Sequence, residues 1–415
     1  MHQVIYYIII AIIVIDFIVE RYLEYLNTTR MSNKLPEEVK GIYDVEKYKN
    51  QQAYQRENQR FGLLTSSFSF LLILGMFVFY GFAFVNDIAY EYTSNAILLA
   101  FIFFGILMLA SDILNTPFSI YDTFKIEEKY GFNKTTFKTF MLDKIKGWLI
   151  GGLVGGGLLA LIIWIYQKTQ DMFWVYAWLL VAGFSLFMAM FYSNLIVPLF
   201  NKQIPLEKGE LRDAIQSFSE KVGFKLDNIF VIDGSKRSTK ANAYFTGFWK
   251  KKRIVLYDTL INDMESEEMV AVLAHEIGHY KKKHFAQGLI ISILHTGVLL
   301  YIFSLLVGSP ALSKALGVEE PNFHIGLIAF GILYSPVSFV LDIFMNMLSR
   351  KNEYQADEFA AVNYKPEALA SALKKMSVKN LSNLTPHPAY VFFNYSHPTL
   401  LQRLAFLKKI EKNEG

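Results

Sequence analysis

Seven stretches of this chain are long and apolar enough to cross a bilayer, and they restrict its possible folds more than any other feature. Six of them have at least 20 residues, enough for a helix to span a hydrocarbon layer of about 30 Å, and the first has 16; within this layer the backbone must satisfy its own hydrogen bonds. None contains lysine or arginine. The sequence therefore predicts a mainly α-helical, polytopic membrane protein. The stretches are Val4–Val19, Phe61–Val85, Asn95–Leu114, Gly147–Tyr166, Met172–Phe200, Ala286–Leu306 and His324–Leu348.

The basic residues predict how the chain is oriented in the membrane. The loops after the first and third stretches carry eight and six Lys or Arg residues. With seven spans, only Lys168 and Lys314 of the 41 basic residues fall on the opposite side. Because basic loops stay in the cytoplasm, we expect an N-terminus outside the cell or in the lumen. The first stretch lacks a basic leader and a cleavage site, so we expect a retained span.

Four segments follow from this topology. We expect spans one to five with two cytosolic loops in residues 1–200, a cytosolic segment in 201–285, spans six and seven in 286–348, and a cytosolic C-terminal segment in 349–415. Neither cytosolic segment is large enough to fold alone, so we expect the two to pack on each other. Patterns in the first predict helices at Glu210–Val222 and 265–283 and strands at Asn228–Asp233 and Arg253–Tyr257.

The second of these helices carries His275, Glu276 and His279 in an HExxH pattern. Histidines four residues apart lie on one helix face, so both imidazoles can bind one metal ion. Glu276 lies beside the first ligand and is placed to deprotonate an attacking water as a general base. The chain has no cysteine, so the metal must be held by histidine and carboxylate. The motif predicts a hydrolase with one Zn²⁺ per chain.

A third zinc ligand is needed, and topology narrows the search. The first acid after the seventh span is Glu353, which returns to the side of the membrane that holds the two histidines. Asp357 lies one helical turn further on the same face, placed to accept the second ring N–H of a ligand histidine. Without the HExxH motif, Arg350, Glu353 and Asp357 would be interpreted as an exposed helix with local ion pairs.

Together these residues resemble the type I CAAX prenyl endopeptidases, integral-membrane zinc peptidases of the gluzincin kind. The resemblance covers nearly the whole chain: seven spans, H-E-I-G-H between the fifth and sixth, and N-E-Y-Q-A-D after the seventh. It extends to N-A-Y-F-T-G-F at 242–248, Ser396-His397-Pro398 and Arg403. It implies helices arranged around a chamber, with a gluzincin-like peptidase domain on the cytoplasmic side.

The resemblance also implies roles for residues outside the zinc ligands. His397 would stabilise the oxyanion of the tetrahedral intermediate, and Arg403 would orient the site or the third ligand. Without the resemblance, His397-Pro398 would be a helix-breaking turn. Asn242, Ala243 and Tyr244 would form a strand that binds an extended peptide. The implied substrates are hydrophobic or C-terminally lipidated peptides, with prenylated C-termini among them.

Composition and charge predict location and partners. The cysteine-free, Ile/Lys/Asn/Tyr/Phe-rich usage indicates a bacterial-type member, which would lie in the inner membrane; a eukaryotic member would lie in the endoplasmic reticulum. Short basic runs such as Lys281–Lys283 lie close to the membrane, so we expect lipid headgroups and no nucleic acid as their partners. His284 has no partner at ligand spacing and is interpreted as an interfacial or packing residue.

Two other functions compete with this interpretation. A quality-control protease of the HtpX kind shares HExxH and a downstream glutamate, but that class has four spans. A membrane scaffold with an inactive site has no reason to keep Glu276. Intramembrane proteolysis of the site-2 kind is disfavoured, because the charged residues Glu267, Glu268 and Lys281–Lys283 flank the motif too closely for a buried span.

Overall fold

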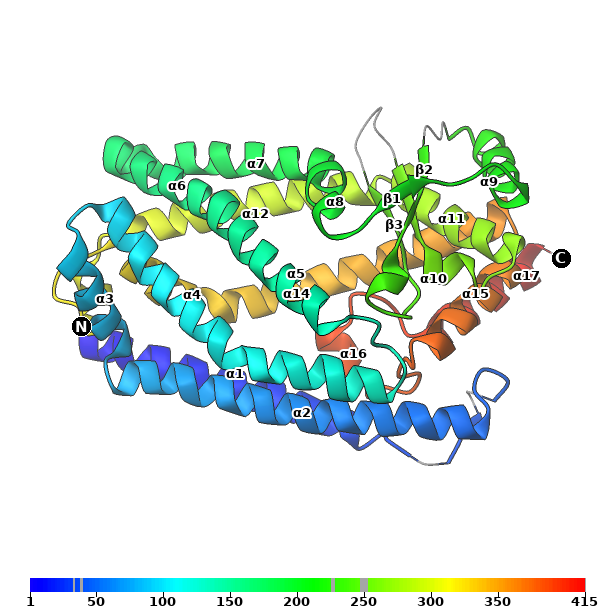
Figure 1. Ribbon diagram of the computed structural model, residues 1–415, viewed down its shortest axis with the longest axis horizontal. Coiled ribbons are helices and arrows are strands. Elements are labelled where there is room, and N and C mark those ends of the chain that lie inside the picture. Colours follow the sequence, from blue (N-terminus) through cyan, green and yellow to red (C-terminus); the bar gives the residue numbers. More distant parts are fainter. Residues whose placement is uncertain (33, 38–39, 225–227, 247–252, 415) are drawn as a thin grey trace.

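The molecule consists of long helices that run along its longest axis and a small sheet-containing region at one end (Figure 1). The computed structural model describes residues 1–32, 34–37, 40–224, 228–246 and 253–414. The long helical part contains α1 (His2–Thr28), α2 (Val45–Val78), α3 (Gly81–Tyr92), α4 (Ala96–Tyr121), α5 (Phe137–Ile150), α6 (Gly156–Thr169), α7 (Phe173–Leu195), α8 (Val197–Phe200), α12 (His284–Leu306), α13 (Pro310–Ala315) and α14 (Phe323–Asn363).

Six helical runs in the described chain are long and apolar enough to cross a membrane. One of them, Phe137–Phe200, contains two passes, because the chain reverses near Gln170, which has a positive φ of 43°. After this reversal α7 packs back against α6 (Figure 1). The mainly helical, polytopic fold predicted from the sequence is confirmed, with these two passes accounting for the fourth and fifth predicted spans.

The predicted C-terminal end of the second span is wrong. We expected a continuous helix to Val85, but α2 ends at Val78 and α3 begins at Gly81. Tyr80 adopts a left-handed conformation (φ 55°) between them. Both sides of this break are apolar, so hydropathy gives no signal for it.

Several helices extend well beyond their apolar stretches, α1, α2 and α14 among them. The most important of them for the position of Glu353 and Asp357 is α14, whose 41 residues make a rod about 60 Å long. Pro336 is accommodated inside it. The apolar stretch ends near Leu348, where charged residues begin, but the helix continues to Asn363. Hydropathy thus marks the edge of the apolar region and not the end of the helix.

The sheet-containing region is built from both predicted soluble segments. Its sheet has strand order β1-β2-β4-β3, with β2 and β4 parallel and the two outer pairs antiparallel. The predicted strands at Asn228–Asp233 and Arg253–Tyr257 are confirmed as β2 and β4. The region contains β1 (Gln203–Pro205), α9 (Glu210–Lys221), β2 (Asn228–Ile232), β3 (Ala243–Thr246), β4 (Arg253–Tyr257), α10 (Asp258–Ile261), α11 (Ser266–Lys281), α15 (Pro366–Lys379), α16 (Pro388–Asn394) and α17 (Leu400–Glu414).

The helix α11 is the core of this region. Glu265 and Glu268 form a capping box that fixes its first turn, and ten of its residues are buried. It packs against α9, α14 and α15. Glu268 also accepts hydrogen bonds from Ser371 Oγ (2.6 Å) and Lys375 Nζ (2.7 Å) of α15. These contacts join the segment before the sixth pass to the segment after the seventh.

A polar cavity lies between the long helices and the C-terminal segment. Its volume is about 620 Å³, and its lining includes Glu20, Arg21 and Glu24 of α1, Gln59 of α2 and Tyr390 of α16. Such a lining suits water. A single chamber bounded by all seven passes stays a prediction.

Candidate metal centre

The centre forms where α11 and α14 approach each other closely. At the crossing, a Cβ on Gly278 would lie 3.1 Å from the Cα and carbonyl oxygen of Ala356 and from the Cβ of Phe359. A larger residue at position 278 would therefore push the two helices apart. The glycine inside H-E-I-G-H and the alanine inside N-E-Y-Q-A-D are thus packing residues that bring the two motifs together.

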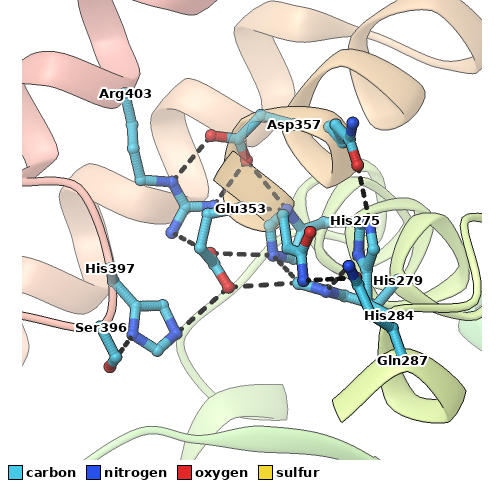
Figure 2. A network of polar contacts seen from close by, with 11 residues as sticks. His275, His279, His284, Gln287, Glu353, Asp357, Ser396, His397 and Arg403 are labelled. Carbon is cyan, nitrogen blue, oxygen red and sulfur yellow. Dashed lines mark hydrogen bonds and ion pairs between the residues drawn. The ribbon is translucent and has the colours of Figure 1, made fainter. Parts of the chain in front are cut away.

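Three side chains from these helices converge on one point (Figure 2). The Nε2 atoms of His275 and His279 are 3.1 Å apart. Glu353 Oε1 lies 3.2 Å from His279 Nε2, and Glu353 Oε2 lies 3.4 Å from His275 Nε2. The Glu353 side chain is only 6% exposed, and its Oε2 makes no hydrogen bond within the described chain.

This donor set fits a zinc ion. Tetrahedral zinc with bonds of about 2.0–2.1 Å holds its ligand atoms about 3.3–3.4 Å apart, close to the separations seen here. The Nδ1 atoms of both histidines face other partners, so both Nε2 lone pairs are available for a metal. Burial alone would raise the pKa of Glu353, but the adjacent rings of His275 and His279 outweigh it and hold this pKa well below its usual value.

Behind His275 stands an aspartate–arginine pair. Asp357 Oδ1 lies 2.9 Å from His275 Nδ1. Arg403 of α17 donates to the same carboxylate from Nε (2.8 Å) and Nη2 (2.6 Å). Burial would lower the pKa of His275, but its hydrogen bonds with Asp357 and Glu353 outweigh this effect and raise the pKa to about 9. Asp357 beside Nδ1 favours the tautomer with the proton on that atom, which leaves Nε2 for a metal.

Behind His279 stands a residue whose place the sequence did not reveal. His284 Nδ1 lies 3.0 Å from His279 Nδ1, and His284 Nε2 lies 2.8 Å from Gln355 Oε1. His284 is buried, as expected of a packing residue, but the contact with His279 was not expected. Lys283, with a left-handed φ of 62°, turns the chain between α11 and α12 and brings His284 back to the motif. In the sequence, the only indication of this contact is that His284 follows His279 by five residues.

The other predicted residues take distinct positions. Glu276 is half-buried on α11 and makes no hydrogen bond or ion pair within the described residues. Burial raises its pKa. His397 Nε2 lies 3.2 Å from Glu353 Oε1, and its Nδ1 is 2.9 Å from Ser396 Oγ. The His397 side chain is 61% exposed, so it is accessible from the cavity that it lines.

The predicted peptide-binding residues lie at the sheet edge. Asn242 precedes β3, and Ala243 and Tyr244 belong to it. Within the described chain, β4 is the only strand beside β3, and α11 packs against β3. The Tyr244 hydroxyl points toward Gln203 Nε2 at 3.4 Å. Gly247 and Phe248 of the same motif lie outside the described residues.

Comparisons with known proteins cover the chain from end to end. Residues 24–202 match the family model for CAAX prenyl protease N-terminal, five membrane helices, and residues 205–411 match that for peptidase family M48. A CAAX prenyl protease 1 homolog of Oryza sativa subsp. japonica is 35% identical, covering 98% of both chains. CAAX prenyl protease 1 of Saccharomyces cerevisiae is 34% identical, covering 96% of this chain and 94% of its own. This chain belongs to the CAAX prenyl protease 1 family of M48 peptidases.

A solved structure agrees with this membership. The crystal structure of S. mikatae Ste24p has a TM-score of 0.92 at 33% identity, covering 97% of this chain and 99% of its own. As an M48 peptidase, the chain is a zinc metalloendopeptidase and a multi-pass membrane protein, with His275, His279 and Glu353 as its zinc site. The interpretation of its composition as bacterial has no support, because these relatives are eukaryotic.

We expect the contact behind His279 to matter for metal retention in this M48 peptidase. If Nε2 of His279 held the zinc, its ring proton would lie on Nδ1 and would be donated to His284 Nδ1, and His284 Nε2 would then donate to Gln355 Oε1. Removal of the acceptor in His284→Ala should weaken zinc binding about 10–100-fold, as measured by competition with a chelator. His284→Gln keeps a side-chain acceptor and should recover much of this loss. Unchanged zinc affinity in His284→Ala would show that the contact has no such role.

Proposed function

We propose that this M48 peptidase cleaves peptide bonds near the C-termini of prenylated proteins. The observation that carries this proposal is the likeness to proteins named CAAX prenyl protease 1 along nearly the entire chain, with the zinc donor set complete. The packing of the zinc helix against β3 supports it, because β3 has one neighbouring strand in the described chain and an extended chain end can pair with its other side.

In the proposed mechanism Glu276 is the general base. When bound, zinc polarises the scissile carbonyl and makes the attacking water more acidic. The Glu276 carboxylate takes the proton from this water and later gives it to the nitrogen of the leaving amine. Its freedom from other partners and its raised pKa support this role, because a base with a pKa nearer neutrality also serves as an acid.

Three more residues support the reaction in this proposal. His397 donates a hydrogen bond from Nε2 to the oxyanion that develops as the water attacks. Its exposure to the cavity and its position beside Glu353 support this assignment. Asp357 and Arg403 act through His275, since both carboxylate oxygens of Asp357 accept from Arg403 while Oδ1 also faces the ring.

The substrate backbone would pair with β3. Asn242 is exposed and precedes the strand, Ala243 offers its main chain at the free edge, and Tyr244 is held toward the long helices by Gln203. Hydrogen bonds to a strand edge recognise main chain rather than sequence, so they suit an enzyme with several protein substrates.

We propose the endoplasmic reticulum as the membrane that holds this enzyme, with the N-terminus in the lumen. The eukaryotic relatives support the first point, and the distribution of Lys and Arg supports the second. Segments 201–285 and 349–415 would then form one cytosolic catalytic unit, as the packing of α11 on α14 and α15 supports. The lipid bilayer is its permanent partner.

The proposal is tested by competition among three substrates. We expect the purified full-length enzyme to cleave a farnesylated C-terminal peptide at least about tenfold faster than its unprenylated twin, because the lipid adds apolar surface to bury. An unfolded membrane protein should be cleaved no faster than the twin. Rates are measured in the same vesicles by mass spectrometry of the products. Equal turnover of all three substrates would contradict the proposal and favour quality control.

A further inference from the structure

On the side of β3 that faces away from β4, only every second residue presents its backbone N–H and carbonyl to an incoming peptide. The Asn242 carbonyl accepts from Tyr257 N–H of β4 at 3.2 Å. In an antiparallel pair, the backbone groups of one residue point to the partner and those of the next point away. The N–H and carbonyl of Ala241 and Ala243 therefore point away from β4, toward the side where a peptide would pair.

Ala241, the first of these positions, is already occupied. Asn380 Oδ1 accepts from Ala241 N–H at 3.0 Å, and Asn380 Nδ2 donates to the Ala241 carbonyl at 3.2 Å. One carboxamide thus makes both hydrogen bonds that a residue of a neighbouring strand would make. Ala241 is buried as a result. At Ala243 the N–H is bound only by the adjacent Asn242 side chain (2.8 Å), which a substrate can displace.

The chain around Asn380 is built to hold this amide in place. Asn380 follows the last turn of α15, and Leu381 after it adopts a left-handed φ of 48°, which is unfavourable for a branched side chain. Gln55 of α2 donates to the Leu381 carbonyl at 3.2 Å, and Tyr43 donates to the Ser377 carbonyl at 2.9 Å. Contacts with the N-terminal part of the chain therefore stabilise a strained turn directly beside the sheet edge.

Asn380 lines the same cavity as His397 and Arg403. This cavity has a volume of about 430 Å³, and Ser382 also lines it. Arg403 is the one cation among the described lining residues, and Asp357 already binds it. The remaining polar lining consists of neutral amides and hydroxyls together with His397, which suits a peptide main chain better than a charged ligand.

We propose that Asn380 ends the peptide-binding edge and so limits how many residues the substrate carries beyond the scissile bond. The inference rests on the proposed function, in which the short end of the substrate is its C-terminus. A peptide that pairs antiparallel to β3 at Ala243 has its C-terminal side toward Ala241, and it cannot continue there because Asn380 holds both ladder positions. A longer C-terminal end must leave the sheet edge and loses its hydrogen bonds. Asn380 is therefore a specificity-determining residue of this peptidase.

The test uses full-length protein and farnesylated peptides whose C-terminal ends are extended by one, two or three residues. For the wild type, we expect kcat/KM to fall at least about tenfold between the shortest and longest peptides. In the Asn380→Ala variant, the ratio of kcat/KM for the shortest peptide to that for the longest should be about threefold or less. Ser382→Ala is the matched control, because it removes a polar group from the same cavity wall and leaves Ala241 untouched. Zinc content and thermal unfolding are measured for every variant.

Several outcomes would overturn the inference. One is a wild type that cleaves all lengths equally, and another is an Asn380→Ala variant that keeps zinc and the wild-type length preference. If Asn380→Ala loses zinc or unfolds, Asn380→Asp decides the question: it keeps the acceptor for Ala241 N–H, loses the donor, and should relax the preference in part. An Asn380→Asp variant with the wild-type ratio would then refute the proposal. A wild type that cleaves no prenylated peptide at all would instead refute the proposed function.

Discussion

Replacement of Glu276 by glutamine is expected to abolish peptide cleavage and to leave zinc bound. The two side chains have nearly the same shape, but an amide cannot accept a proton from the attacking water. Loss of a general base typically costs 10²–10⁴ in rate, and we expect on the order of 10³ or more here. Glu276 makes no hydrogen bond or ion pair with the metal donors in the described chain, so the zinc site should keep its geometry.

The measurement combines metal analysis with single-turnover cleavage of a prenylated peptide. Glu267→Gln is the matched control, because the same change is made on the same helix at an exposed residue paired only with Lys365 on the surface. It should retain zinc and activity. If Glu276→Gln cleaved at the wild-type rate with zinc bound, the assignment of the base would be wrong.

Replacement of Glu353 by glutamine is expected to release the zinc. Glu353 is the only carboxylate in the donor set, and its pKa is held well below the usual value by the two histidine rings. A neutral amide is a weak zinc ligand, and the change also removes the charge that Arg403 Nη1 faces at 3.5 Å. Zinc affinity should fall by more than the roughly 100-fold limit typical of residues behind the ligands.

Equilibrium dialysis against a chelator gives the affinity of each variant, and thermal unfolding separates metal loss from misfolding. Glu358→Gln is the control, since Glu358 is exposed on the same helix, five residues further along. It should bind zinc like the wild type. If a Glu353→Gln variant kept wild-type zinc affinity, Glu353 would not be the third zinc ligand, and the assignment of the metal centre would be wrong.

Much of this architecture could be predicted because the signals are local. Apolar stretches without Lys or Arg gave the passes, and the four-residue spacing of His275 and His279 gave two ligands. Glu353 could be predicted because topology returns the chain to the correct side, and the donor set of the structure includes it. The strands β2 and β4 have strong alternating or apolar patterns and were found within one residue of their bounds.

The contacts that could not be predicted depend on backbone geometry between elements. The approach of α11 to α14 at Gly278 requires a small residue on each helix, and neither carries a signal alone. The return of His284 to His279 depends on the left-handed conformation of Lys283, which no glycine or asparagine marks. The pairing of Asn380 with Ala241 joins positions 139 residues apart.

The continuous rod α14 has a mechanical consequence. Glu353 stands on the same unbroken helix as the last apolar pass, whereas His275 and His279 stand on α11. The zinc ligands therefore come from two helices, α14, which includes the last apolar pass, and α11, which does not. The two helices cross closely at Gly278. Because a helix adjusts its tilt to the thickness of the bilayer, a change in the tilt of α14 would move Glu353 relative to His275 and His279 on α11.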